Sequence, residues 1–199
     1  MINIFRSRSL RLPHRKTIRI YSNGRTEKNY FNLQKKAYRG SRTVKVIHKE
    51  GKEIKTILEK IKRECDGRSL ISGDKIFCVV DVDTLTDINI LEVFRVKPKY
   101  VDLILSNPNF ELWLLLHFQC HTTRITKDET EPIVRAHLHE YHKPNIEPFF
   151  SQLKENETTA MRNAKVLRAQ HLKEEVDLNS IAANPHTYVD YVIEFLNLH

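Results

Sequence analysis

The chain has 199 residues, of which 40% are hydrophobic and 29% are charged, so its composition is that of a globular protein and not of a disordered tail. Its 33 Lys and Arg residues outnumber its 25 Asp and Glu residues, which gives a net charge of +8. No apolar run approaches the roughly 18 residues of a membrane-spanning helix, and three cysteines without a Cys-x-x-Cys pair argue against a disulfide framework and for the cytoplasm.

The basic residues are concentrated near the N-terminus. Residues 1–50 contain 14 Lys and Arg residues but only two acidic ones, so this segment carries a charge of +12. We expect residues 1–16 to form a basic arm that lacks the apolar core of a secretory signal. Clustered Lys and Arg bind phosphate backbones by displacing counterions, which indicates a nucleic-acid partner. A basic surface that serves solubility alone is the alternative.

Strands and helices alternate over the next hundred residues. Strands are predicted at 17–21, 43–47, 76–80 and 100–105, and helices at 26–39, 54–65 and 88–94. Thr26 is the expected N-cap of the first helix. The unbroken apolar run at 76–80 is typical of a strand buried on both faces. The pattern predicts an α/β fold over residues 17–120, with a mostly parallel, Rossmann-like sheet flanked by helices.

The second half of the chain has the periodicity of helices. Helices are predicted at 110–119, 129–141, 146–156, 159–174 and 188–196, and no strand is expected after residue 109. We interpret residues 121–199 as a helical extension packed on the α/β core.

The most specific local feature of the core is a pair of acids, Asp81 and Asp83, directly after the buried strand. Residues two apart on a strand project from the same face, so these carboxylates are expected to converge on one hard cation such as Mg²⁺. The alternative is structural: Asp81 caps the next helix and Asp83 belongs to a solvated turn.

Two other strand ends carry polar residues. The first strand runs through Asn23 and Gly24 into a helix whose first turn contains Glu27, an arrangement that favours anions but is also common in plain connections. The fourth strand leads to Glu111, in the first turn of an apolar helix. Glu111 either stabilises the helix dipole or points into the same crevice as the aspartates.

Several of these segments resemble the RloB-like proteins. The resemblance rests on Asn23-Gly24-x-Thr26-Glu27-x-Asn29-Tyr30-Phe31, Asp81-x-Asp83, Ser106-Asn107-Pro108-x-Phe110-Glu111-x-Trp113-Leu114-Leu115-Leu116-His117-Phe118, Asn163-Ala164-Lys165 and Asn184-Pro185-x-Thr187-Tyr188-Val189. It implies a Toprim-like core, metal-dependent phosphodiester chemistry, and a role in anti-phage defence through abortive infection beside an ABC-type ATPase. It leaves homo-oligomerisation open and implies no membrane partner.

A nuclease of the kind that the resemblance implies needs a metal site and phosphate contacts. Asp81, Asp83 and Glu111 are expected to hold Mg²⁺ or Mn²⁺, with Glu27 as an alternative source of the third carboxylate. Phosphates of the RNA or DNA are expected to be bound by basic residues of the arm and the first helix: Arg6, Arg8, Arg11, Arg15, Arg25 and Lys28.

Two departures from the family pattern keep a second interpretation open. Asn23 stands where the family has a glutamate, and Thr84 stands where many relatives carry a third acid. An amide takes up no proton at ordinary pH and is a weaker ligand for Mg²⁺. The chain is therefore either a nuclease whose missing acid is supplied by Glu27 or Glu111, or a degenerate Toprim module that binds nucleic acid or a partner protein without cutting.

Overall fold

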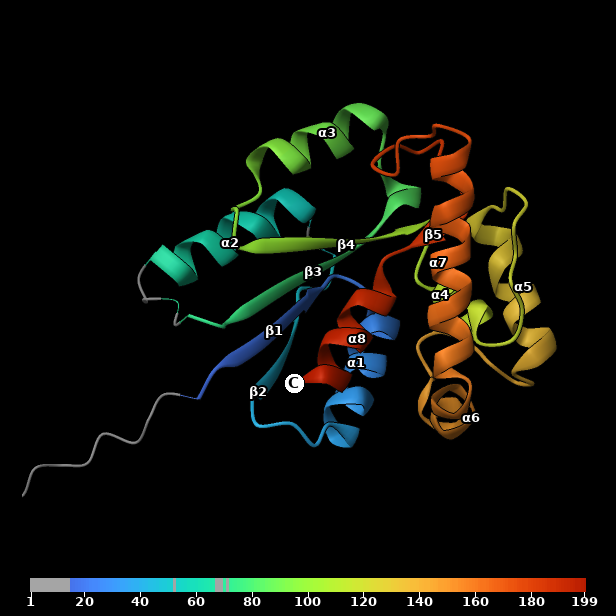
Figure 1. Ribbon diagram of the computed structural model, residues 1–199, viewed down its shortest axis with the longest axis horizontal. Coiled ribbons are helices and arrows are strands. Elements are labelled where there is room, and N and C mark those ends of the chain that lie inside the picture. Colours follow the sequence, from blue (N-terminus) through green and yellow to red (C-terminus); the bar gives the residue numbers. More distant parts are fainter. Residues whose placement is uncertain (1–14, 52, 67–69, 71) are drawn as a thin grey trace, which may run out of the picture.

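A computed structural model describes residues 15–51, 53–66, 70 and 72–199. It contains a five-stranded sheet in the order β2-β1-β3-β4-β5 (Figure 1). The strands are β1 (Thr17–Ser22), β2 (Thr43–His48), β3 (Lys75–Asp81), β4 (Val101–Asn107) and β5 (His186–Thr187). The first four are parallel and β5 pairs antiparallel with the end of β4, so the sheet is mostly parallel, as predicted.

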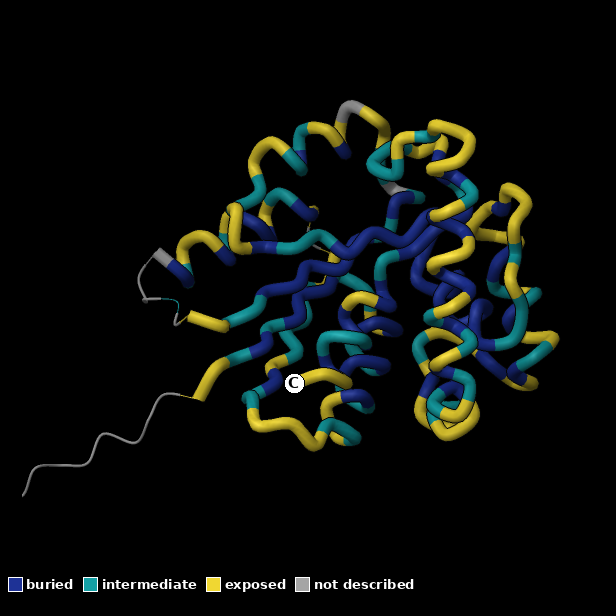
Figure 2. The backbone as a smooth tube through the Cα atoms, in the orientation of Figure 1, coloured by how far each residue is buried: buried dark blue, intermediate teal, exposed yellow. Residues whose placement is uncertain are grey.

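Helices cover both faces of the sheet, and alternate strand residues face opposite layers. Phe77 and Val79 of β3 belong to one apolar cluster, and Cys78 and Val80 belong to another. The first cluster includes α1 (Arg25–Ala37) and α8 (Val189–Leu198), whereas the second includes α2 (Ile54–Asp66) and α3 (Asp87–Val96). The inner residues of β3 are buried, as the dark tube in Figure 2 shows, and they belong alternately to the two clusters, which confirms the interpretation of its apolar run.

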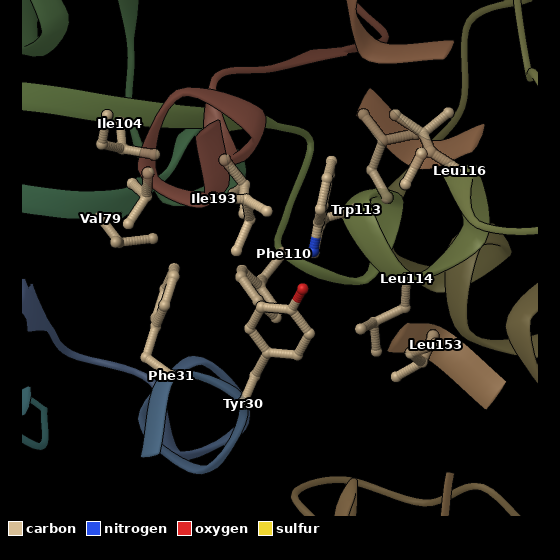
Figure 3. Packing of buried hydrophobic residues seen from close by; sticks show 14 of the residues in the cluster. Tyr30, Phe31, Val79, Ile104, Phe110, Trp113, Leu114, Leu116, Leu153 and Ile193 are labelled. Atoms are coloured by element: carbon tan, nitrogen blue, oxygen red, sulfur yellow. The ribbon is translucent and has the colours of Figure 1, made fainter. Parts of the chain in front are cut away.

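The remaining helices gather beside the sheet and share the first cluster. They are α4 (Glu111–Leu116), α5 (Lys127–His137), α6 (Phe150–Glu155) and α7 (Glu157–Lys173), with 3₁₀ turns at Val82–Thr84 and Glu147–Phe149. Every residue of α4 is buried. Figure 3 shows Trp113 of α4 and Ile193 of α8 packed with Tyr30 of α1 and Phe110. The helical extension and the α/β core therefore have a continuous apolar interior.

Three local predictions were wrong. A strand does occur after residue 109: His186–Thr187 forms β5, and its Thr187 hydroxyl lies 2.8 Å from the Ser106 hydroxyl of β4. Thr26 is not the N-cap of the first helix: the helix begins at Arg25 with Gly24 as N-cap, and Thr26 lies buried inside the first turn. The helix expected at 146–156 is broken into a 3₁₀ turn and α6. Within the described ranges, no helix has the combined length and apolarity to cross a bilayer.

Candidate active site

The segments that follow β1, β3 and β4 meet at one edge of the sheet. The chain passes from β1 to β2 in one direction and later occupies β3 and β4 on the other side of β1, so the strand order reverses between β1 and β3. Ligands of open α/β sheets bind in the crevice at such a switch point. Four acids reach this edge: Glu27 in the first turn of α1, Asp81 at the end of β3, Asp83 in the following 3₁₀ turn, and Glu111 at the start of α4.

The four carboxylates are close enough to repel one another. Burial holds the pKa of Asp81 well above its usual range, and the negative charges of Glu27, Glu111 and Asp83 raise this pKa further. Burial also raises the pKa of Glu27 to about 7, with Glu111 and Asp83 adding to the effect. The four predicted acids therefore form one electrostatically coupled cluster, which we call the acidic cluster.

Glu27 enters the acidic cluster by folding back over the start of its own helix. A Cβ atom at Gly24 would overlap the Glu27 carboxylate, so the glycine makes room for this side chain. Glu27 is 3% exposed, and its Oε1 has no hydrogen-bond partner among the described residues. Glu27 lies in the first helix turn, as predicted, and Gly24 permits its position; the binding of an anion at this turn stays a prediction.

The two aspartates do not share a strand face. Asp81 is the last residue of β3, whereas Asp83 lies in the 3₁₀ turn beyond it, so the predicted strand spacing does not bring them together. The backbone N–H of Asp83 donates to the Pro108 carbonyl at 2.9 Å, which fixes the turn against the segment after β4. The Asp81 side chain makes no capping hydrogen bond to the turn, so capping does not account for this residue.

Glu111 points into the acidic cluster and is also ion-paired there. Its Oε2 lies 2.8 Å from Nζ of Lys143, and its Oε1 accepts a 3.3 Å hydrogen bond from the Tyr141 hydroxyl. Lys143 also lowers the pKa of both Glu27 and Asp81, so its ammonium group acts on the whole cluster. The salt bridge therefore lies within the crevice and does not draw Glu111 away from it.

Two lysines of the helical extension are partners that sequence reasoning missed. Besides Lys143, Lys127 at the start of α5 places Nζ 2.8 Å from Oδ2 of Asp83. The nearby carboxylate raises the pKa of Lys127. Neither lysine belongs to a motif or follows a helical spacing from the acids, so no local pattern could have identified them.

The acidic cluster has the chemistry of a hard divalent cation site. All four acids offer oxygen ligands, which suit Mg²⁺ and Mn²⁺, and buried Oε1 of Glu27 and Oδ1 of Asp83 lack hydrogen-bond partners among the described residues. Within that part of the chain, no three acidic, His or Cys side chains already stand in metal-binding geometry. Two lysines against four acids leave a negative excess when the acids are ionised, so the charge and the ligand type, though not the present geometry, match a divalent cation.

The predicted nucleic-acid contacts are spread over the two ends of β1. Lys28 and Arg25 of α1 lie at the carboxyl end, near the acidic cluster, and Arg25 is ion-paired with Glu50. Arg15 precedes β1 and is therefore separated from the cluster by the length of a six-residue strand, about 20 Å. Arg6, Arg8 and Arg11 lie outside the described residues. Only part of the basic segment therefore flanks the crevice.

The raised pKa of Glu27 predicts how the free energy of unfolding of the metal-free protein, kept in EDTA, depends on pH. Folding raises the pKa of this carboxyl group from 4.5 to about 7. At a pH low enough to protonate it in both the folded and the unfolded state, the group does not lower the free energy of unfolding. Above the folded-state pKa the group is ionised in both states, and it lowers the free energy of unfolding by its full amount. We expect Glu27→Gln to raise the free energy of unfolding at pH about 8 by on the order of 2 kcal/mol, and the gain to disappear near pH about 4. Urea titrations at both pH values measure it.

A matched control for this variant is Glu59→Gln, at an exposed position of α2. It should leave the free energy of unfolding unchanged at either pH, because an exposed carboxyl group carries no burial cost. A lower free energy of unfolding for Glu27→Gln than for the wild type at pH about 8 would contradict the inference that the Glu27 carboxylate is destabilised by burial and by repulsion.

Comparison with known proteins identifies the family. The sequence model of the RloB-like protein family matches residues 18–196, which includes the sheet, the acidic cluster and nearly all of the helical extension. No curated protein and no solved structure matches the chain. With the match covering the fold from β1 to α8, the chain belongs to the RloB-like protein family.

Proposed function

We propose that this RloB-like protein is a divalent-metal-dependent nuclease that hydrolyses phosphodiester bonds of RNA or DNA. The observation that carries the proposal is the acidic cluster: Glu27, Asp81, Asp83 and Glu111 come from three separate parts of the chain and meet at the switch point of the sheet. Fold stability does not call for four repelling carboxylates in one place, two of them more than nine-tenths buried. Such a cluster is typical of a functional site.

The residues divide the chemistry among them. Asp81, Asp83 and Glu111 would hold Mg²⁺ or Mn²⁺, which when bound stabilises the charge that develops on the phosphate and lowers the pKa of a bound water. Glu27, with its pKa near 7, is suited to accept a proton from the attacking water at neutral pH. Lys127 and Lys143 offer cationic Nζ atoms that attract the phosphate to an otherwise negative crevice.

A second candidate function is favoured by Asn23. This residue lines the same cavity as Asp81, at the position where the family has a glutamate, and its amide cannot carry the charge of that acid. A protein in which this change has abolished cleavage would still bind nucleic acid or a partner such as an ABC-type ATPase. Either function is compatible with anti-phage defence, which the family resemblance implies.

Parallel incubations distinguish the two functions. The full chain and its Asn23→Glu variant are incubated with tRNA, single-stranded and duplex substrates in Mg²⁺, in Mn²⁺ and in EDTA. We expect the wild type to cut at least one substrate only when a divalent ion is present, because Glu27 and Glu111 supply the carboxylates that Asn23 lacks. No cleavage by the wild type, together with cleavage by Asn23→Glu, would establish that the wild-type module is catalytically degenerate and would overturn the nuclease.

A further inference from the structure

A cavity of about 480 Å³ opens beside the acidic cluster, between the start of α2 and the helix α3. Asp81 lines it from the side of the cluster, and Asn23 lines it from the end of β1. The volume lies within the range of small-ligand pockets, about 300–1,000 Å³. A ligand in this cavity would therefore reach the edge of the proposed metal site.

The lining of the cavity is apolar on its walls and carries two carboxamides. Ile54, Val80 and Val93 are buried aliphatic side chains of α2, β3 and α3. The carboxamides of Asn23 and Asn89 make no hydrogen bond to other described residues, so both are available to a ligand. A flat, neutral ring with donors and acceptors on its edge matches such walls, and asparagine pairs with base edges through two hydrogen bonds.

Charge argues against a phosphate in this cavity. Among the described lining residues, the lysine Lys55 is ion-paired with Glu92, and Glu53 adds a negative charge, to which Asp81 adds another when it is ionised. A phosphate would be repelled here in the absence of a metal ion, whereas a neutral base would not. The phosphate and the base of one nucleotide are thus expected to occupy different parts of the site.

We propose that the cavity between α2 and α3 binds an unpaired nucleobase of the strand whose phosphate lies at the acidic cluster, with Asn23 and Asn89 contacting the base edge. The proposal rests on the proposed function and adds its substrate class: single-stranded or unpaired nucleic acid. A paired base is stacked inside a duplex and cannot enter a side cavity unless it is flipped out, which costs a few kcal/mol. The Asn23 amide then acts in base recognition and not as a weakened metal ligand.

Binding of free nucleosides to the full chain in EDTA tests the proposal without metal or cleavage. Adenosine, guanosine, cytidine and uridine are titrated separately and followed by NMR and calorimetry. At least one should saturate, with a dissociation constant on the order of 0.1–1 mM, as expected for a ligand of this size. Adenosine 5′-monophosphate should bind no better than adenosine, because its phosphate meets the carboxylates.

Substitutions on one helix locate the binding. Asn89 is exposed at the mouth of the cavity, so Asn89→Phe should fold and should abolish nucleoside binding by filling the entrance. Leu91→Phe, at a 60% exposed position of the same helix outside the cavity, should leave binding unchanged. Asn23→Ala should weaken binding about fivefold through loss of a base-edge hydrogen bond.

The outcomes separate this proposal from the nuclease. No saturable binding of any nucleoside, or equal binding by the wild type and Asn89→Phe, overturns the base cavity, and metal-dependent cleavage by the same protein would leave the nuclease intact. Saturable binding that Asn89→Phe removes supports the base cavity, even where the wild type cuts nothing. Faster cleavage of single-stranded than of duplex substrate, with KM raised in Asn89→Phe and kcat little changed, also supports it.

Discussion

Replacing Asp81 by asparagine should lower metal-dependent cleavage by about a thousandfold or more, because the charge stabilisation that a bound metal supplies is worth several kcal/mol. Asp81 lies at the centre of the acidic cluster, since Glu27, Glu111 and Asp83 all act on its carboxyl group. Asparagine has nearly the same shape, so the fold should persist. The cleavage rate under single-turnover conditions measures the effect.

The same variant should keep its affinity for nucleic acid and gain stability in EDTA. At a pH at which Asp81 is ionised, removal of its negative charge reduces the repulsion within the cluster and does not weaken the attraction of phosphates to Lys127 or Lys143. The matched control is Asp102→Asn, at the opposite end of the parallel sheet, where Asp102 is ion-paired with Lys75. Full cleavage by Asp81→Asn, or an equal loss in Asp102→Asn, would remove Asp81 from the mechanism.

The second large effect is expected at Arg168, which joins the C-terminal elements to the sheet. From α7 its guanidinium donates two hydrogen bonds to Asp190 of α8, at 2.8 and 2.6 Å, and another to the carbonyl of Thr187 in β5. Both charged side chains are buried, with 6% and 0% of their surfaces exposed. Arg168→Met leaves the Asp190 charge buried and unpaired, so we expect a loss of about 3–5 kcal/mol in the free energy of unfolding.

Two further variants show whether the loss arises from the unpaired charge. The double variant Arg168→Met/Asp190→Leu should recover much of the stability, because an apolar pair carries no burial cost. Lys165 and Glu194 form an exposed pair between the same two helices, and Lys165→Ala should cost less than about 1 kcal/mol. Equal losses in Arg168→Met and Lys165→Ala, as measured by urea denaturation, would contradict this account.

The main elements of the fold could be predicted because their residue patterns are local. The unbroken apolar run of β3 reflects its burial on two faces. The helical spacing of Ile54, Ile57 and Ile61 reflects the burial of α2 on one face. The strand β5 could not be predicted, since two residues form no pattern. It exists because His186 and Thr187 pair with the end of β4, a contact across about eighty positions of the chain.

The acidic residues of the candidate site could be predicted from the sequence, whereas its two lysines and the neighbouring cavity could not. Asp81, Glu27 and Glu111 follow strands or open helices, so the topology of a parallel sheet brings them to one edge. Lys127 and Lys143 reach the same place from the helical extension, whose packing on the core depends on tertiary contacts such as those of Trp113. The spacing of residues in a sequence does not encode such contacts.

Most directly, the position of a divalent ion in the crystallised full chain tests the acidic cluster as a metal site. An anomalous difference map from crystals equilibrated with Mn²⁺ should contain a peak held by oxygens of Asp81, Asp83 and Glu111 at about 2.1–2.2 Å, within the usual range for such hard oxygen ligands. The peak should disappear in Asp81→Asn. A fully bound Mn²⁺ elsewhere in the chain, with no peak between these carboxylates, would contradict the account.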